Sequence, residues 1–189
     1  MERGMKRSLL SLAAALVAML PGLAHAELPV GATAPEFAAQ GALGGKVFSF
    51  NLKRALRHGP VVLYFFPKAF TKVCTLEAHA FAEASDQYKA AGATLIGMST
   101  DDLPALKDFS SLECRNKFPV ASASPAVVAA YDVDLQRDGK STGLTNRTSY
   151  VIGQDDKIVM AHTDLMDFRQ HVDLTLAAVR ALQQKRQHH

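Results

Sequence analysis

The chain of 189 residues fits one domain, with at most a short appendage. Hydrophobic residues make up 48% and charged residues 21%, which excludes a disordered or low-complexity protein. The formal charge of +3 hints at an acidic partner. The two cysteines, Cys74 and Cys114, are too few for a disulfide-dense small fold or a four-thiolate metal site.

Residues 1–26 have the pattern of a cleaved secretory signal peptide. Three basic side chains precede an uncharged apolar run over residues 9–20, and Ala24-His25-Ala26 follows as a cleavage site. The run is shorter than the roughly 20 residues that a membrane-spanning helix needs. An uncleaved anchor is therefore the weaker interpretation, and we expect export to the periplasm with no stable membrane insertion after cleavage.

Removal of this leader changes the meaning of the charge. The leader holds three basic side chains and Glu2, so only +1 of the formal charge of +3 stays with residues 27–189. A nucleic-acid partner is therefore not expected. We expect residues 27–189 to form a single domain with a disordered tail over about 184–189. Export also places both cysteines where a disulfide can persist.

The first half of this domain begins with a polar segment and a short edge strand at 47–52. The apolar run VVLYFF at 61–66 predicts a strand buried on both faces, followed by a loop at 67–73. Apolar and small residues at helical spacing predict a helix from Cys74 to Gly92. A second buried strand is expected at 93–100, and a helix at 104–113 with Pro104 in its first turn.

The second half continues the alternation of strands and helices. A short helix is predicted at 124–131, with Ser124 as its cap, and the polar, glycine-rich segment 136–146 is predicted to be an exposed loop. Strands at 147–152 and 157–163 flank a turn, and an amphipathic helix follows at 167–185. This order predicts an α/β fold with a mixed central β-sheet and helices on both faces.

Cys74 falls where a buried strand, a loop and a helix start follow one another. Unpaired backbone N–H groups and the positive end of the helix dipole favour a thiolate at such a place. Thr71, three residues earlier, is able to aim its hydroxyl at the sulfur or at the group that the sulfur attacks. Cysteine is also often simply buried, so the placement alone leaves a reactive and a structural role open.

Pro67, Thr71 and Cys74 form P-x-x-x-T-x-x-C, which resembles the active-site motif of the peroxiredoxins. The continuation Cys74-Thr75-x-Glu77 with Phe81 resembles the Q-type branch, the bacterioferritin comigratory proteins. Further segments match that family in order along the chain, and they include GATAPEF at 31–37, GMSTD at 97–101, FPV at 118–120 and RTSYVI at 147–152. The resemblance implies a thioredoxin-like fold.

The resemblance also implies roles for single residues. Cys74 would be the peroxidatic cysteine that becomes a sulfenic acid, Thr71 would hydrogen-bond the peroxide, and Pro67 would shield the pocket from water. Arg147 would stabilise the thiolate and the charge of the transition state, although a solvated arginine at a strand start is the plain alternative. For Glu77 we favour a helix first-turn acid over a partner of the arginine.

Two positions depart from the family pattern. Lys72-Val73 stands where Q-type members commonly have Pro-Gly, and His79 stands where some members carry a resolving cysteine. His79 is expected to be a half-buried helix residue, and no second histidine or acidic cluster makes a metal site with it. The Lys72-Val73 departure removes no catalytic group from the implied site.

The resemblance therefore shifts the resolving role to Cys114, since some Q-type proteins carry that thiol in the later helix. Our hypothesis is an intramolecular Cys74–Cys114 disulfide formed after local unfolding. The alternatives are a permanent structural disulfide, a bystander Cys114 with an external resolving thiol, and pairing with another molecule.

The leading prediction is a thiol peroxidase acting on hydrogen peroxide and organic hydroperoxides, without a cofactor but with an external thiol reductant. We expect a thioredoxin-like reductant in the periplasm and a monomer or weak dimer. A disulfide oxidoreductase is the competing enzyme, but Thr75-Leu76-Glu77 after Cys74 lacks the second cysteine of C-x-x-C. A binding module with one structural disulfide is the non-enzymatic alternative.

Overall fold

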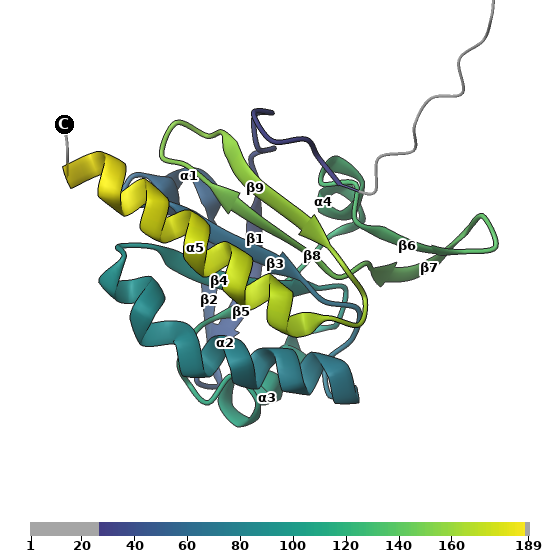
Figure 1. Cartoon of the computed structure of the whole chain (residues 1–189). Coiled ribbons are helices and arrows are strands. Elements are labelled where there is room, and N and C mark those ends of the chain that lie inside the picture. Colours follow the sequence, from purple (N-terminus) through teal and green to yellow (C-terminus); the bar gives the residue numbers. More distant parts are fainter. Residues whose placement is uncertain (1–26, 188–189) are drawn as a thin grey trace, which may run out of the picture.

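The computed structural model describes residues 27–187, which form a central sheet with helices on both faces (Figure 1). The proposed signal peptide at 1–26 lies outside the described residues. In chain order the elements are β1 (Ala38–Leu43), β2 (Lys46–Asn51), α1 (Leu52–Leu56), β3 (Val61–Phe65), α2 (Lys72–Ala90), β4 (Thr94–Ser99), α3 (Leu103–Leu112), β5 (Val120–Ser122), α4 (Pro125–Ala130), β6 (Asp134–Arg137), β7 (Lys140–Thr145), β8 (Thr148–Ile152), β9 (Ile158–Thr163) and α5 (Phe168–Gln187).

The main sheet has seven strands in the order β2-β1-β5-β4-β3-β8-β9. β3 pairs in parallel with β4 and antiparallel with β8, so the sheet is mixed, as the sequence predicts. All five residues of β3 are buried, which agrees with the continuous apolar run. The parallel β3–β4 pair is joined by α2, a crossover helix on one face of the sheet.

Alternate residues of β3 supply two separate hydrophobic cores. Val62, Tyr64 and Phe66 join the core under α2, α3 and α5, whereas the residues between them face α1 and α4. This division follows from the two-residue period of a strand, in which successive side chains point to opposite faces. The helices thus lie on both faces, and the predicted fold class is confirmed.

The sequence pattern misses three short elements and misjudges one segment. The pattern does not predict β1, α1 or β5, and Leu52, the last residue of a predicted strand, begins α1 with Asn51 as its cap. The prediction of a loop at 136–146 is wrong, because β6 and β7 form a two-stranded hairpin there. Its two-residue turn is Asp138-Gly139, with φ of 53° and 72°, the conformation that an Asp-Gly hairpin turn favours.

The C-terminal end also differs from the prediction. α5 continues to Gln187, so residues 184–187 are helical rather than part of a disordered tail, and residues 188–189 lie outside the described part of the chain. Lys185 and Arg186 occupy the last turn of α5, where basic side chains complement the helix dipole. Within residues 27–187 no helix is long and apolar enough to span a membrane.

Gly97 on β4 leaves the space that the Tyr64 ring fills. The Cβ of a larger residue at position 97 would lie 2.6 Å from Cζ of Tyr64 and 2.8 Å from its hydroxyl oxygen. The same ring stacks on Phe81, with the two centroids 4.3 Å apart. A side chain at position 97 would therefore force a packed ring to shift, which explains the glycine.

Replacing Gly97 with alanine is expected to destabilise the fold by about 1–3 kcal/mol, because the added methyl group overpacks this core. Chemical denaturation measures the loss. In a Tyr64→Leu background the same Gly97→Ala change should cost clearly less, since the ring that it meets is gone. Equal costs in the two backgrounds would contradict the steric explanation.

Candidate active site

The predicted motif residues lie between the end of β3 and the first turn of α2. Pro67 is half-buried directly after the strand, and Thr71 is the N-cap of α2. The helix begins at Lys72, two residues before the predicted start, so Cys74 is its third residue. Backbone N–H groups in this first turn have no partner within the helix, which favours a negatively charged sulfur.

Thr71 is exposed, and its hydroxyl donates to the carbonyl oxygen of Lys68 at 2.9 Å rather than capping α2. Phe70, just before it, has a left-handed backbone with φ of 63°, which is rare for a bulky residue. Its ring packs edge-on against Phe109 of α3, with centroids 5.3 Å apart. This contact helps to hold the strained turn that leads into Cys74.

Polar side chains from the neighbouring strands anchor the same loop. Asp101 accepts the backbone N–H of Ala69 at 2.7 Å and the hydroxyl of Ser99 at 2.8 Å. On the other side, the hydroxyl of Thr145 donates to the carbonyl oxygen of Phe66 at 2.7 Å. The segment GMSTD resembles the family in sequence, but its sequence does not indicate that Ser99 and Asp101 anchor this loop.

Arg147 enters the site from β8, far from the motif in sequence. Phe65 pairs with Thr148 in the antiparallel β3–β8 ladder, so Arg147 lies beside the end of β3. Its side chain is 3% exposed, and Nη2 donates to Sγ of Cys74 at 3.4 Å. The structure therefore brings the predicted arginine and cysteine into direct contact, and the alternative of a solvated arginine is wrong.

The preferred prediction for Glu77, a first-turn acid that serves the helix dipole, is wrong, and the alternative of a partner for the arginine is correct. Glu77 is completely buried and forms an ion pair with Nη1 of Arg147. Burial raises the pKa of the Glu77 carboxyl well above its usual range, because the desolvation cost exceeds the stabilisation that Arg147 supplies. The paired acid lies one helical turn after Cys74, and it fixes the guanidinium between two residues of α2.

Cys114 follows the C-cap of α3 and is completely buried, in the same core as Cys74. Burial raises the pKa of the Cys114 thiol well above its usual range, and the neighbouring Glu113 carboxylate adds to the effect. Both cysteines are free thiols in the structure. The two residues after Cys114, Arg115 and Asn116, both have left-handed backbones, with φ of 50° and 58°.

His79 links α2 to the segment around Cys114. Its Nε2 lies 2.7 Å from Oε2 of Glu113, and the ring is half-buried, as the sequence predicts. One turn further along α2, Glu83 pairs with Arg115 at 3.4 Å. These contacts hold the end of α3 against α2 in the reduced protein.

Comparison with known proteins shows which family this chain belongs to. The sequence profile of the AhpC/TSA family matches residues 30–161. The chain belongs to this family. It is 30% identical to peroxiredoxin Q of Arabidopsis thaliana chloroplasts over 167 residues, which cover 86% of this chain and 72% of that protein.

Two solved structures support the Q-type branch. Peroxidoxin BcpB of Mycobacterium tuberculosis superimposes with a TM-score of 0.72 and 30% identity, covering 81% of this chain and 97% of its own. Peroxiredoxin Q of Xanthomonas campestris gives a TM-score of 0.66 and 27% identity, covering 76% and 90%. The chain is thus a thioredoxin-fold peroxiredoxin of the Q-type, as the motifs indicate, and peroxiredoxins are enzymes that rely on a thiol reductant.

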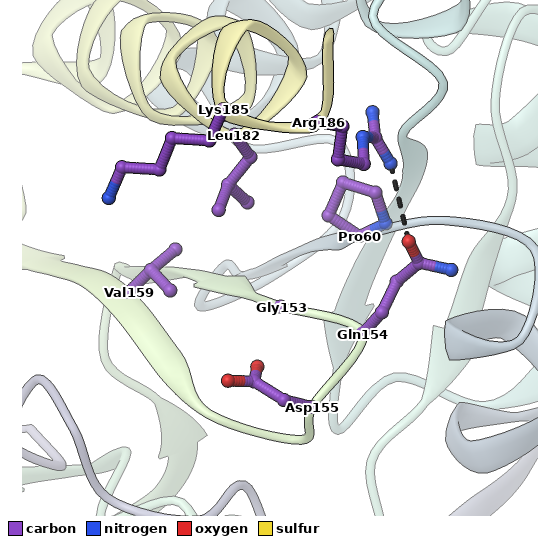
Figure 2. A pocket seen from close by; sticks show the side chains of 8 residues that line it. All are labelled: Pro60, Gly153, Gln154, Asp155, Val159, Leu182, Lys185 and Arg186. Atoms are coloured by element: carbon purple, nitrogen blue, oxygen red, sulfur yellow. Dashed lines mark hydrogen bonds between the residues drawn. The ribbon is translucent and has the colours of Figure 1, made fainter. Parts of the chain in front are cut away.

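Other parts of this peroxiredoxin do not add to the site. A pocket of about 540 Å³ lies beside the last turns of α5, where Arg186 donates to Gln154 (Figure 2). Leu182, in its wall, is about 20 Å along α5 from the first turn of that helix. None of the predicted site residues lines this pocket, and residues 27–187 hold no group of three or more His, Cys, Asp or Glu arranged for a metal ion.

His171 of α5 is a buried neighbour of the site that the sequence analysis did not single out. It is completely buried, and burial is the main reason why its pKa falls to about 4, with the nearby charges of His162 and Arg147 lowering it further. A hydrogen bond to the Asp164 carbonyl oxygen opposes this shift. The imidazole is therefore neutral in the folded protein at neutral pH.

His171 is expected to make the protein less stable in acid. In the unfolded chain its pKa is about 6.5, so between pH 6.5 and pH 4 the unfolded state binds the extra proton and the folded state does not. Its stabilisation is complete above pH 6.5, and about 3 kcal/mol is lost as the pH falls to 4. Denaturation curves of the wild type and His171→Gln at several pH values isolate this contribution; parallel pH profiles would contradict it.

Proposed function

We propose that this peroxiredoxin reduces hydrogen peroxide and organic hydroperoxides with Cys74 as the attacking thiol. The observation that carries the proposal is the 3.4 Å contact from Nη2 of Arg147 to Sγ of Cys74, at the third residue of α2. A buried guanidinium and a helix N-terminus both favour a negatively charged sulfur.

In the proposed reaction, the Cys74 thiolate attacks one peroxide oxygen. A sulfur–oxygen bond forms while the oxygen–oxygen bond breaks, and the leaving hydroxide or alkoxide takes a proton to become water or an alcohol. The sulfur is oxidised to a sulfenic acid and the peroxide is reduced. Arg147 stabilises the negative charge that moves from sulfur to the leaving oxygen.

Thr71 and Pro67 have supporting roles in this proposal. The Thr71 hydroxyl donates to the Lys68 carbonyl oxygen, so the lone pairs of its own oxygen are free to accept a hydrogen bond from the O–H of the peroxide. Pro67 offers no N–H to water and is half-buried at the start of the loop. Together they orient the peroxide and limit water around the sulfur.

Cys114 is the proposed resolving cysteine. Its thiolate attacks the Cys74 sulfenic sulfur, a disulfide forms, and the hydroxyl group leaves as water after taking a proton. Both thiols are buried within the core, and burial disfavours the Cys114 thiolate. The end of α3 and the first turn of α2 therefore have to unfold locally before the sulfurs meet with disulfide geometry.

The proposal extends to the cellular setting. The leader pattern at residues 1–26 supports export to the periplasm, and a thioredoxin-like protein of that compartment would return the disulfide to two thiols. We propose a monomer or a weak dimer as the working form. Cell fractionation with mass measurement of the mature N-terminus tests export, and a peroxidase found full-length in the cytosol would contradict it.

Removal of Cys114 should separate the two chemical steps. Treated with one equivalent of peroxide, the wild type should lose two hydrogens as a disulfide, whereas Cys114→Ser should keep a sulfenic acid that a dimedone probe traps. Intact-protein mass spectrometry distinguishes these products. Sustained turnover of Cys114→Ser at the wild-type rate would show that an external thiol resolves Cys74 instead.

The contribution of Arg147 is testable in a single turnover. Arg147→Gln should lower the second-order rate constant for peroxide by about 10²–10³-fold, a loss typical for one group that stabilises transition-state charge. Stopped-flow oxidation of the reduced protein measures it, with the exposed Arg137→Gln as a matched control that should change nothing. A wild-type Cys74 that reacts no faster than a free thiol would overturn the peroxidase proposal.

A further inference from the structure

The third donor of the Arg147 guanidinium is held by the segment between β9 and α5. Nε donates to the carbonyl oxygen of Leu165 at 3.0 Å, while the other two nitrogens serve Cys74 and Glu77. The orientation of the guanidinium toward the sulfur thus depends on where the Leu165 carbonyl points. In Figure 1 this segment leads into α5 at the same end of the sheet as the start of α2.

The segment itself is a tight turn that is hydrogen-bonded to Arg147, the residue just before β8. The backbone N–H of Asp164 donates to the carbonyl oxygen of Arg147 at 3.2 Å. The Asp164 carboxylate accepts the backbone N–H groups of Met166 and Asp167 at 2.7 Å and 2.8 Å. The imidazole of His171, from α5, also contacts the backbone at the start of this turn.

Nε2 of the His171 imidazole lies 2.9 Å from the carbonyl oxygen of Asp164, and its Nδ1 lies 2.9 Å from the hydroxyl of Ser149 on β8. A carbonyl oxygen only accepts, so Nε2 carries the proton; Nδ1 of the neutral ring then accepts from the Ser149 hydroxyl. Both ring nitrogens are used, which fixes the tautomer and the orientation of the ring.

Ser149 and Arg147 are two residues apart at the start of β8, so both point toward α2 and α5. His171 therefore ties together the strand that carries the arginine and the turn that holds its Nε. From these contacts we propose that His171 is a positioning residue for the peroxidatic site, acting through Leu165 and Arg147 on Cys74. It touches no reacting atom.

This inference rests on the proposed role of Cys74 and Arg147, and its test is built to fail separately from that role. All variants are made in a Cys114→Ser background, so that Cys74 is the single thiol. His171→Leu removes both hydrogen bonds, whereas His171→Gln keeps an amide donor near the position of Nε2. Ser149→Ala leaves the imidazole but removes the partner that fixes its tautomer.

Two measurements report on the site. Stopped-flow oxidation should show the rate constant for hydrogen peroxide falling on the order of tenfold to a hundredfold in His171→Leu, because a small misplacement of the guanidinium is costly. The rate of Cys74 alkylation by iodoacetamide at neutral pH should fall several-fold, since the thiolate loses part of its stabilisation. His171→Gln should stay near the wild type in both, and Ser149→Ala should lie between.

Tyr88→Phe is the matched control. The Tyr88 hydroxyl donates to the carbonyl oxygen of Val172 at 3.0 Å, so its loss weakens the packing of the same helix without touching the Asp164 turn. It should lower the melting temperature and leave both readouts of Cys74 unchanged. An equal loss in Tyr88→Phe, or in His171→Gln and His171→Leu alike, would assign the effect to general packing and overturn the proposal.

If His171→Leu folds and both measurements on Cys74 stay at their wild-type values, the proposal is also overturned. If His171→Leu does not fold, wild-type values of both measurements in Ser149→Ala overturn the proposal instead. Slow oxidation of the parent protein by peroxide would instead reject the proposed function. In that case alkylation still decides the role of His171, because iodoacetamide reports the state of the Cys74 thiol with no peroxide present.

Discussion

The structure of the site depends on one buried positive charge, the guanidinium of Arg147, and on the groups that accept its hydrogen bonds. The Arg147 residue is buried, and burial of a guanidinium without partners would be prohibitively costly. Glu77, the Leu165 carbonyl and the Cys74 sulfur share its donors. Removing one partner of a buried ion pair typically costs about 3–5 kcal/mol, so the elements that carry these groups are fixed relative to one another.

The fold meets this requirement with its most regular elements. β3 and β8 are neighbouring interior strands of the sheet, and their register places Arg147 beside the end of β3. The chain then turns through the Asp101-anchored loop into α2, which presents Cys74 and Glu77 on one face a turn apart. Rigid strands and a long helix hold the guanidinium, while the turn that leads into α2 contains the left-handed backbone of Phe70.

The sequence is most informative where several residues together form a long apolar run or match a family motif. VVLYFF predicted the central strand, and the Pro67, Thr71 and Cys74 motif with Arg147 predicted the site. The alanine-rich β1 and the three-residue β5 have little pattern of their own, since their pairing partners stabilise them. The Asp138-Gly139 pair is typical of a hairpin turn, but the polar composition of the residues around it favours a loop. Glu77 and His171 were not assignable, because nothing local distinguishes a buried polar residue with partners across the fold from an exposed one.

The contacts that join α2 to the end of α3 have a consequence for how far this protein can be stabilised. His79 with Glu113 and Glu83 with Arg115 hold the segment that carries Cys114 in its buried position. In the proposed cycle that segment must leave the core once per turnover, and the sulfenic acid stays exposed to a second peroxide until it does. Tightening this edge would therefore raise thermal tolerance and, by the same interaction, prolong the interval in which irreversible oxidation occurs. At the contact between α2 and the end of α3, greater thermal stability is therefore expected to come with lower resistance to peroxide.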